Sequence, residues 1–199
     1  MKRRDFCGLG LAPLLLAGNV RAAQEPAKPM SRTAQAGMFP NVPLITQNGE
    51  KVRFYDDLIH DKVVLLNFFL VECTDGLCPT ITANLRKVQD LLGERMGRDV
   101  FFRSISLKPR HDTPKVLREY AANFEVKPGW TFLTGKPADI ETLRRALGFV
   151  DWDPIRDKDL NNHTAMGRYG DDKLDRWGGV ALRSSPENIA STFKWLSEV

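Results

Sequence analysis

The apolar positions of the chain follow two different periods. Residues 62–71, KVVLLNFFLV, form a continuous apolar run rich in β-favouring side chains, which is typical of a strand buried on both faces. After residue 78, four apolar positions recur on one helical face: Ile81, Leu85, Val88 and Leu92. The pattern therefore predicts a central strand followed directly by a helix, with Pro79 at the first helical position.

The same alternation continues towards the C-terminus. Strand-like runs occupy residues 98–107, 129–135, 164–169 and 180–183. Helical patterns occupy residues 113–124, the segment from Ile140 to Leu147, and residues 185–199, with Thr113 and Ser185 as N-caps. Residues 43–54 read as an N-terminal β-hairpin around Asn48-Gly49. This order predicts an α/β fold with a central β-sheet flanked by helices.

The first 23 residues have the layout of an export signal. A basic start, MKRRDF, precedes the apolar run GLGLAPLLLAGNV and the small-residue sequence VRAA. Arg3, Arg4 and Phe6 favour a twin-arginine-type signal that is cleaved near Ala22 or Ala23 and carries Cys7 away. We therefore expect a periplasmic protein. The alternatives are a signal retained as an anchor on the periplasmic side of the membrane and a disordered basic tail.

Removal of this signal changes the charge of the chain, because residues 1–23 carry +3 of the formal net charge of +4. The remainder is nearly neutral and has no basic stripe interleaved with aromatic residues, which excludes nucleic-acid binding. Residues 24–41 are rich in Pro and Ala and are predicted to form a flexible tether. Residues 42–199 are long enough to form one domain, which we expect to be a monomer.

Two cysteines, Cys73 and Cys78, follow the predicted central strand in VECTDGLCPT. At the start of a helix, Cys78 meets unpaired N–H groups and the positive end of the helix dipole, so we expect it to be the more acidic thiol. The residues alone leave four interpretations: a stable disulfide in a loop that folds back at the Asp75-Gly76 turn, a redox pair, part of a metal site, or two unrelated core thiols. A loop this short closes little chain entropy, so a purely stabilising disulfide is poorly placed here.

The segment LNFFLVECTDGLCP resembles the strand and dithiol loop of the Sco/SenC family of thioredoxin-like copper proteins. SLKPRHDTPKVLREYA is similar to that family's Ser-Val-Asp-Pro-x-x-Asp-Thr-Pro segment and its helix, and WTFLTG matches the following Trp-x-x-Leu-Thr-Gly strand. His163-Thr164 resembles the family's metal-binding His-Ser/Thr. Each motif is weak by itself, but their shared order extends the likeness over residues 42–197.

This resemblance implies a thioredoxin-like fold in which two cysteines and one distant histidine bind one copper ion. Carried over to this sequence, the ligands are Cys73, Cys78 and His163. Members of the family load copper into respiratory oxidase or reduce its copper-ligand cysteines. The implied partner is therefore a copper acceptor such as a respiratory oxidase subunit, or a protein with a disulfide or dithiol. Two thiolates and an imidazole suit copper and would also accept zinc.

Two departures from the family pattern favour thiol chemistry over copper affinity. Four residues, 74–77, separate the cysteines where the family usually has three, and Lys108 stands where the family has an acidic residue. An ammonium group near the site would stabilise thiolates and oppose a bound cation. The alternative function is therefore a thiol–disulfide oxidoreductase that uses the Cys73/Cys78 pair. Analogy with thioredoxin-like enzymes points to Cys73 as the attacking thiol, and the helix dipole points to Cys78.

The other polar candidates receive more local interpretations. Asp75 is predicted to cap a turn, His60 to lie in an exposed turn, and Met166 to pack in the core. His111 lies in the same predicted loop as Lys108 and is a candidate for a secondary role near the cysteines. A peroxidase of the peroxiredoxin kind is a third functional class, but the chain lacks the Thr-x-x-Cys arrangement of such enzymes.

Overall fold

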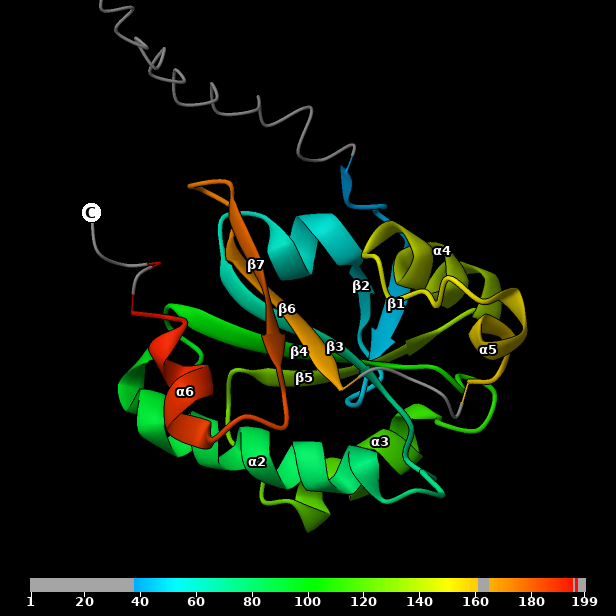
Figure 1. Cartoon of the computed structure of the whole chain (residues 1–199), viewed down its shortest axis with the longest axis horizontal. Coiled ribbons are helices and arrows are strands. Elements are labelled where there is room, and N and C mark those ends of the chain that lie inside the picture. Colours follow the sequence, from blue (N-terminus) through cyan, green and yellow to red (C-terminus); the bar gives the residue numbers. More distant parts are fainter. Residues whose placement is uncertain (1–37, 161–164, 195, 197–199) are drawn as a thin grey trace, which may run out of the picture.

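The computed structural model describes residues 38–160, 165–194 and 196, and its centre is one β-sheet in the order β2-β1-β5-β4-β3-β6-β7 (Figure 1). The strands are β1 (Pro43–Thr46), β2 (Lys51–Arg53), β3 (Val63–Phe69), β4 (Val100–Ser106), β5 (Trp130–Gly135), β6 (Met166–Asp171) and β7 (Arg176–Ala181). Strands β3, β4 and β5 are parallel, whereas β1 and β6 run antiparallel to β5 and β3. The predicted α/β class is confirmed.

Helices cover both faces of this sheet (Figure 1). They are η1 (Phe54–Ile59), α2 (Leu77–Leu92), η2 (Gly93–Arg95), α3 (Pro114–Asn123), α4 (Pro137–Ala146), α5 (Pro154–Lys158) and α6 (Pro186–Ser191). Helices α2, α3 and α6 lie on one side of the sheet, and η1 and α4 lie on the other. None of the helices in the described part of the chain has both the length and the apolar character that a membrane span needs.

Strand β3 is the buried central strand that the apolar run predicts. It pairs in parallel with β4 from Val63↔Val100 to Phe69↔Ser106, and β6 pairs with its other edge. Six of its seven residues are buried. Because β3, β4 and β5 are parallel, the loops that follow them leave the sheet at the same edge, and the loop after β3 contains Cys73.

The N-terminal hairpin is confirmed, but its turn differs from the predicted tight turn. The connection spans residues 47–50, and of the Asn48-Gly49 pair only Gly49 takes a positive φ, of 85°. The hydroxyl oxygen of Thr46 accepts hydrogen bonds from the backbone N–H groups of Asn48 and Glu50 at 3.3 and 3.2 Å. These side-chain bonds shape a four-residue loop that does not need a second left-handed residue.

Several boundaries also differ from the sequence pattern. Helix α2 begins at Leu77, so Pro79 is its third residue, and α5 forms in a segment for which no helix was predicted. The π-helix η1 was not predicted. Phe39 is 1% exposed and packs against Trp177, so the packed region begins before the predicted boundary at residue 42. The predicted signal and residues 24–37 of the predicted tether lie outside the described residues.

Candidate metal and redox centre

The cysteine loop bends sharply between β3 and α2. Gly76 precedes the helix with a φ of 71°, a left-handed conformation that suits glycine. The side chain of Asp75 accepts a hydrogen bond from the backbone N–H of Leu77 at 2.9 Å and thereby satisfies one of the unpaired donors at the helix start. The prediction that Asp75 caps a turn is confirmed.

This bend brings the two cysteines together, and no disulfide bond joins them. The backbone N–H of Cys78 donates to Cys73 Sγ at 3.2 Å, and the thiol of Cys73 donates to Asp75 Oδ1 at 2.8 Å. The backbone N–H of Leu70, at the end of the central strand, donates to Cys78 Sγ at 3.3 Å. Both sulfur atoms therefore lie at one end of the sheet, within a network of backbone donors.

The environments of the two sulfur atoms differ strongly. Cys78 is 1% exposed, and Cys73 is only partly buried. Burial raises the pKa of the Cys78 thiol, and the side chain of Cys73 raises it further, while the hydrogen bond from Leu70 opposes both effects. The prediction that the helix start favours the Cys78 thiolate is therefore wrong, because removal from water outweighs the helix dipole at this position.

A second loop, which follows β4, braces the cysteine loop through Asp112. This carboxylate is 1% exposed and accepts hydrogen bonds from the Ser106 hydroxyl at 2.6 Å and from the Val71 backbone N–H at 3.4 Å. Val71 lies two residues before Cys73. Asp112 therefore ties the end of β4 to the start of the dithiol loop.

His111 joins the same two loops from outside. Its Nδ1 lies 2.9 Å from Asp112 Oδ1, and its Nε2 lies 3.2 Å from Glu72 Oε1. The hydrogen bond to Asp112 and the charge of Glu72 raise the pKa of His111. Glu72 and Asp112 were not singled out in the sequence. Their signal was their position directly after neighbouring parallel strands, whose carboxyl ends meet at one edge.

The remaining predicted site residues have different outcomes. Lys108 lies in the loop after β4, where its backbone N–H donates to the Ser106 hydroxyl at 3.0 Å. His60 is a turn residue whose side chain is 39% exposed. His163, the third ligand implied by the resemblance, lies outside the described residues. The structure therefore brings Cys73 and Cys78 together, and the ligand role of His163 stays a prediction.

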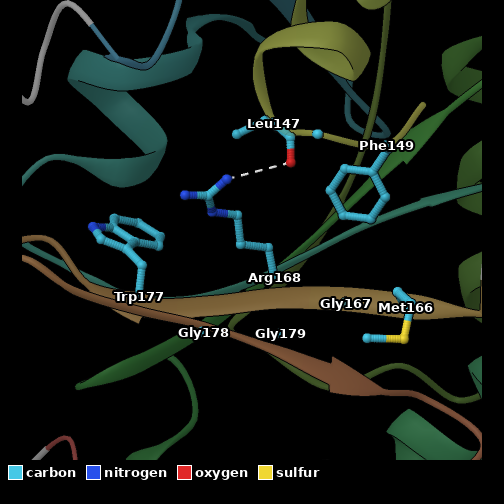
Figure 2. A pocket seen from close by; sticks show the side chains of 9 residues that line it. Leu147, Phe149, Met166, Gly167, Arg168, Trp177, Gly178 and Gly179 are labelled. Atoms are coloured by element: carbon cyan, nitrogen blue, oxygen red, sulfur yellow. Dashed lines mark hydrogen bonds between the residues drawn. The ribbon is translucent and has the colours of Figure 1, made fainter. Parts of the chain in front are cut away.

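A cavity of about 480 Å³ lies between the end of α4 and strands β6 and β7. Figure 2 shows the Arg168 side chain extending between Trp177 and Phe149, where it donates to the Leu147 carbonyl oxygen at 3.3 Å. Met166 also lines this cavity and is 42% exposed, so the prediction that it packs in the core is wrong. It is the first residue of β6 and lies opposite Ala181 on the edge strand β7, where little covers it.

The donor chemistry of the dithiol fits a soft metal ion. Thiolate sulfur suits Cu(I), whereas carbonyl and carboxylate oxygen suit harder ions. The two sulfur atoms supply such ligands from one short loop, and the partly buried Cys73 leaves them open to solvent on one side. The same pair can also close into a disulfide, provided that the loop allows the required sulfur geometry.

Comparison with known proteins agrees with the resemblance found in the sequence. A family model described as SCO1/SenC matches residues 32–193. A SCO2-like protein of Rickettsia prowazekii (strain Madrid E) is 34% identical over 100 residues, which make up 50% of this chain and 46% of that protein. The chain thus spans about half the length of the curated relatives it matches.

Solved structures extend the likeness over most of the domain. The copper-bound ScoI of Bradyrhizobium japonicum is 28% identical, with a TM-score of 0.62 over 77% of this chain and 96% of ScoI. BsSco, described as a member of the Sco family of cytochrome c oxidase assembly proteins with a disulfide switch, is 25% identical. Its TM-score is 0.62 over 80% of this chain and 94% of BsSco. The fold is thus the thioredoxin-like fold of Sco proteins.

Proposed function

Because this chain belongs to the SCO1/SenC family, we propose that it is an exported protein that binds copper through Cys73, Cys78 and His163 and delivers it for respiratory oxidase assembly. The observation that carries this proposal is the proximity of the two cysteines at one edge of the sheet, where the Cys78 backbone nitrogen lies 3.2 Å from Cys73 Sγ. Two thiolates and one imidazole form a ligand set that suits copper as cargo.

The course of the chain supports the inclusion of His163. Strand β6 runs antiparallel to β3, so the start of β6 lies at the edge where β3 ends. The described chain resumes at Ala165, two residues after His163. We include His163 because the resemblance implies it as the third ligand, and the described chain that follows it enters the sheet at the same edge as the dithiol.

The proposed partner and location follow from the family and from the N-terminal sequence. BsSco is described as belonging to a family of cytochrome c oxidase assembly proteins, and we extend that role to this chain with a respiratory oxidase subunit as copper acceptor. The twin-arginine-type sequence at Arg3 and Arg4 supports export to the periplasm, either as a free protein or anchored by the signal.

A Cu(I) titration tests the ligand set. The full-length reduced chain is titrated anaerobically against a competing Cu(I) chelator, beside the variants Cys73→Ser, Cys78→Ser and His163→Ala. We expect binding of one Cu(I) ion that is weakened at least tenfold in each variant. His60→Ala is the matched control, because it removes an imidazole at the opposite end of β3 and should leave Cu(I) binding unchanged. Binding that is indifferent to His163 would reject the three-ligand set.

The second candidate function is reduction of a partner disulfide, and the unequal exposure of the two thiols favours it specifically. The Cys73 thiolate attacks one sulfur of the partner, forms a mixed disulfide and releases the first partner thiolate. The Cys78 thiolate then attacks Cys73 Sγ and releases the second partner thiolate. Two electrons pass to the partner, and this chain ends with a Cys73–Cys78 disulfide. In this proposal the more accessible Cys73 is the attacking thiol.

Single-cysteine variants show which cysteine attacks the partner disulfide and which one resolves the mixed disulfide. In Cys78→Ser, the mixed disulfide with a model disulfide substrate should accumulate, because the resolving thiol is absent. In Cys73→Ser, it should form at least tenfold more slowly. Accumulation in Cys73→Ser alone would mean that Cys78 attacks.

A further inference from the structure

A second cluster of metal-binding groups lies at the opposite end of β3 from the dithiol. Three residues each contribute one possible ligand atom, and these atoms all lie within 4.8 Å of one another: His60, Asp61 and Asp172. His60 and Asp61 precede β3, and Asp172 follows β6. The backbone pairing Val63↔Asp171 brings these two segments together, and the Asp172 N–H donates to the Lys62 carbonyl oxygen at 3.1 Å. The sheet itself therefore assembles the cluster.

Asp172 is the unusual member of this cluster. The residue is 3% exposed, yet its Oδ1 is buried and has no hydrogen-bond partner among the residues that the structure describes. Buried polar groups are almost always paired, and a carboxylate oxygen without a partner is costly. The other oxygen, Oδ2, accepts from the Asp61 backbone N–H at 2.9 Å and from the Tyr55 hydroxyl at 3.4 Å. These bonds fix the carboxylate beside Asp61, while Oδ1 is left without a hydrogen-bond partner among the described residues.

The other two groups stand in position to complete a site. His60 Nδ1 lies 3.8 Å from Asp61 Oδ2, and tetrahedral zinc with bonds of 2.0 to 2.2 Å separates its ligands by about 3.4 Å. The imidazole packs edge-on against the Tyr55 ring at 5.6 Å between centroids, which restricts its orientation. Both side chains line an open cavity of about 430 Å³, so an ion can enter from solvent.

We propose that His60, Asp61 and Asp172 form a second site, for a divalent transition-metal ion such as Zn²⁺ or Cu²⁺. One imidazole and two carboxylates are nitrogen and oxygen ligands, which suit these ions and not the thiophilic Cu(I). With three protein ligands, a coordination position stays open to solvent water. The buried Asp172 supplies the base of the site, and the half-exposed His60 and Asp61 close over the ion.

The charges around the site set its selectivity. Lys62 Nζ donates to the His60 carbonyl oxygen at 3.2 Å, and Lys62, Lys173 and Arg98 line the same cavity together with Asp99 and Asp171. The three cationic groups offset the charges of these two carboxylates and repel a cation, so an alkali or magnesium ion bound mainly by charge gains little here. An ion that forms strong bonds to the imidazole nitrogen overcomes this repulsion, which favours zinc and copper(II) over magnesium.

Zinc titration calorimetry tests the proposal in a full-length chain without sulfur ligands, which carries Cys7→Ser, Cys73→Ser and Cys78→Ser. We expect one Zn²⁺ to bind, and His60→Gln and Asp172→Asn each to weaken binding at least tenfold. His111→Gln is the matched control and should leave the binding unchanged, and His163→Gln tests whether the imidazole of the proposed copper site contributes to zinc binding. Binding that survives His60→Gln, or that is lost with His163→Gln, would overturn the proposal, as would the absence of any binding.

Folding of the variants is checked by far-UV circular dichroism and urea unfolding. Asp172 is buried, so its substitution has the greatest effect on folding. If Asp172→Asn does not fold, His60→Gln and Asp61→Asn, at half-exposed positions, decide the outcome by themselves. Electron paramagnetic resonance of the Cu²⁺-loaded chain provides a second readout. Coupling to one nitrogen that disappears in His60→Gln supports the site, and unchanged coupling rejects it.

Discussion

Two chemically identical side chains, those of Cys73 and Cys78, differ strongly in their exposure to solvent. Cys73 Sγ accepts one backbone N–H and donates to Asp75, whereas Cys78 Sγ is held under the end of β3 by Leu70. Burial raises the pKa of the Cys78 thiol because a thiolate there loses its hydration. The helix start offers N–H groups and a partial positive charge, but these do not replace the lost water.

This difference predicts unequal alkylation of the two thiols. At pH 8, Cys73 in the Cys78→Ser variant should react with iodoacetamide at least about tenfold faster than Cys78 in the Cys73→Ser variant, because each unit by which the pKa is raised lowers the thiolate fraction tenfold. Mass spectrometry of quenched samples gives both rates. Equal rates, or a faster rate for Cys78, would show that burial does not determine the relative reactivity of the two thiols.

The ion pair between Arg144 and Asp157 anchors α5 to α4. Arg144 binds both carboxylate oxygens of Asp157, at 2.6 and 2.9 Å, and Asp157 Oδ1 also accepts from the Asp151 backbone N–H at 2.9 Å. Both side chains are at most 9% exposed. The hydrogen bond from Arg144, followed by that from Asp151, lowers the pKa of Asp157 below its ordinary value.

A lowered folded-state pKa makes this pair pH-dependent in a defined direction. Its contribution is fully present above the unfolded pKa of about 3.9 and is lost as the pH falls from there towards the folded value. The urea midpoint of the native chain should therefore fall between pH 5 and pH 2, and that fall should be smaller in Asp157→Asn. Glu119→Gln is the control, since Glu119 is exposed and lies 4.0 Å from Lys115. An identical pH profile for Asp157→Asn would contradict the assignment.

At the scale of elements, the spacing of apolar residues was enough to predict a strand or helix wherever burial of one face determines that element. Strand β3 and helix α2 were predicted because their apolar residues repeat with the period of the element. The π-helix η1 was not, since FYDDLI is short and is held by distant partners: Asn41 Oδ1 accepts from the Tyr55 N–H at 3.0 Å. Tertiary contacts of this kind leave no periodic signal.

The same limit applies to the candidate site. The dithiol could be read from the sequence because both cysteines lie in one loop after a recognisable strand. The bracing by Asp112 and the raised pKa of Cys78 depend on a neighbouring strand and on burial, which one-dimensional spacing does not record. The cluster of His60, Asp61 and Asp172 was missed for the same reason, since Asp172 lies 111 positions after Asp61 in the chain and meets it only through the sheet.

Gly129, just before β5, lies where the backbone passes very close to Gly97, so a side chain at this position can be tested for its cost. Its φ is +93°, and a Cβ there would clash with the backbone nitrogen of Gly97. Gly129→Ala should therefore lower the free energy of unfolding by roughly 2 to 4 kcal/mol, from backbone strain together with a clash that no side-chain rotation relieves. Urea denaturation measures this loss.

Gly148 is the matched control for that substitution. Its φ is +77°, and a Cβ there meets nothing within 4 Å among the described residues. Gly148→Ala therefore tests the left-handed backbone without the clash and should cost roughly 1 kcal/mol. Equal losses at the two positions would show that the approach of Gly97 to Gly129 adds nothing.

At the scale of the whole molecule, β3 separates the dithiol from the His60 cluster. The strand has seven residues, so its ends lie about 20 Å apart. At one end lie the two sulfur atoms proposed as copper ligands, which oxidation to a disulfide would remove, and at the other lie the nitrogen and oxygen atoms of the proposed second site, which are insensitive to thiol oxidation. Occupancy of the two ends should therefore respond to different ions and to different redox conditions.

This separation predicts that Cu(I) stabilises only the reduced chain. A ligand that binds the folded state alone adds about 2.7 kcal/mol at a free concentration of 100 Kd, which raises the Tm of a domain of this size by about 5 to 10 °C. Oxidation to a Cys73–Cys78 disulfide removes both sulfur ligands, so the oxidised chain should show no shift. Calorimetric unfolding in chelator-buffered Cu(I) measures the effect, with His60→Ala shifting as the native chain does. An equal shift in the oxidised chain would mean that the stabilising copper lies away from the dithiol.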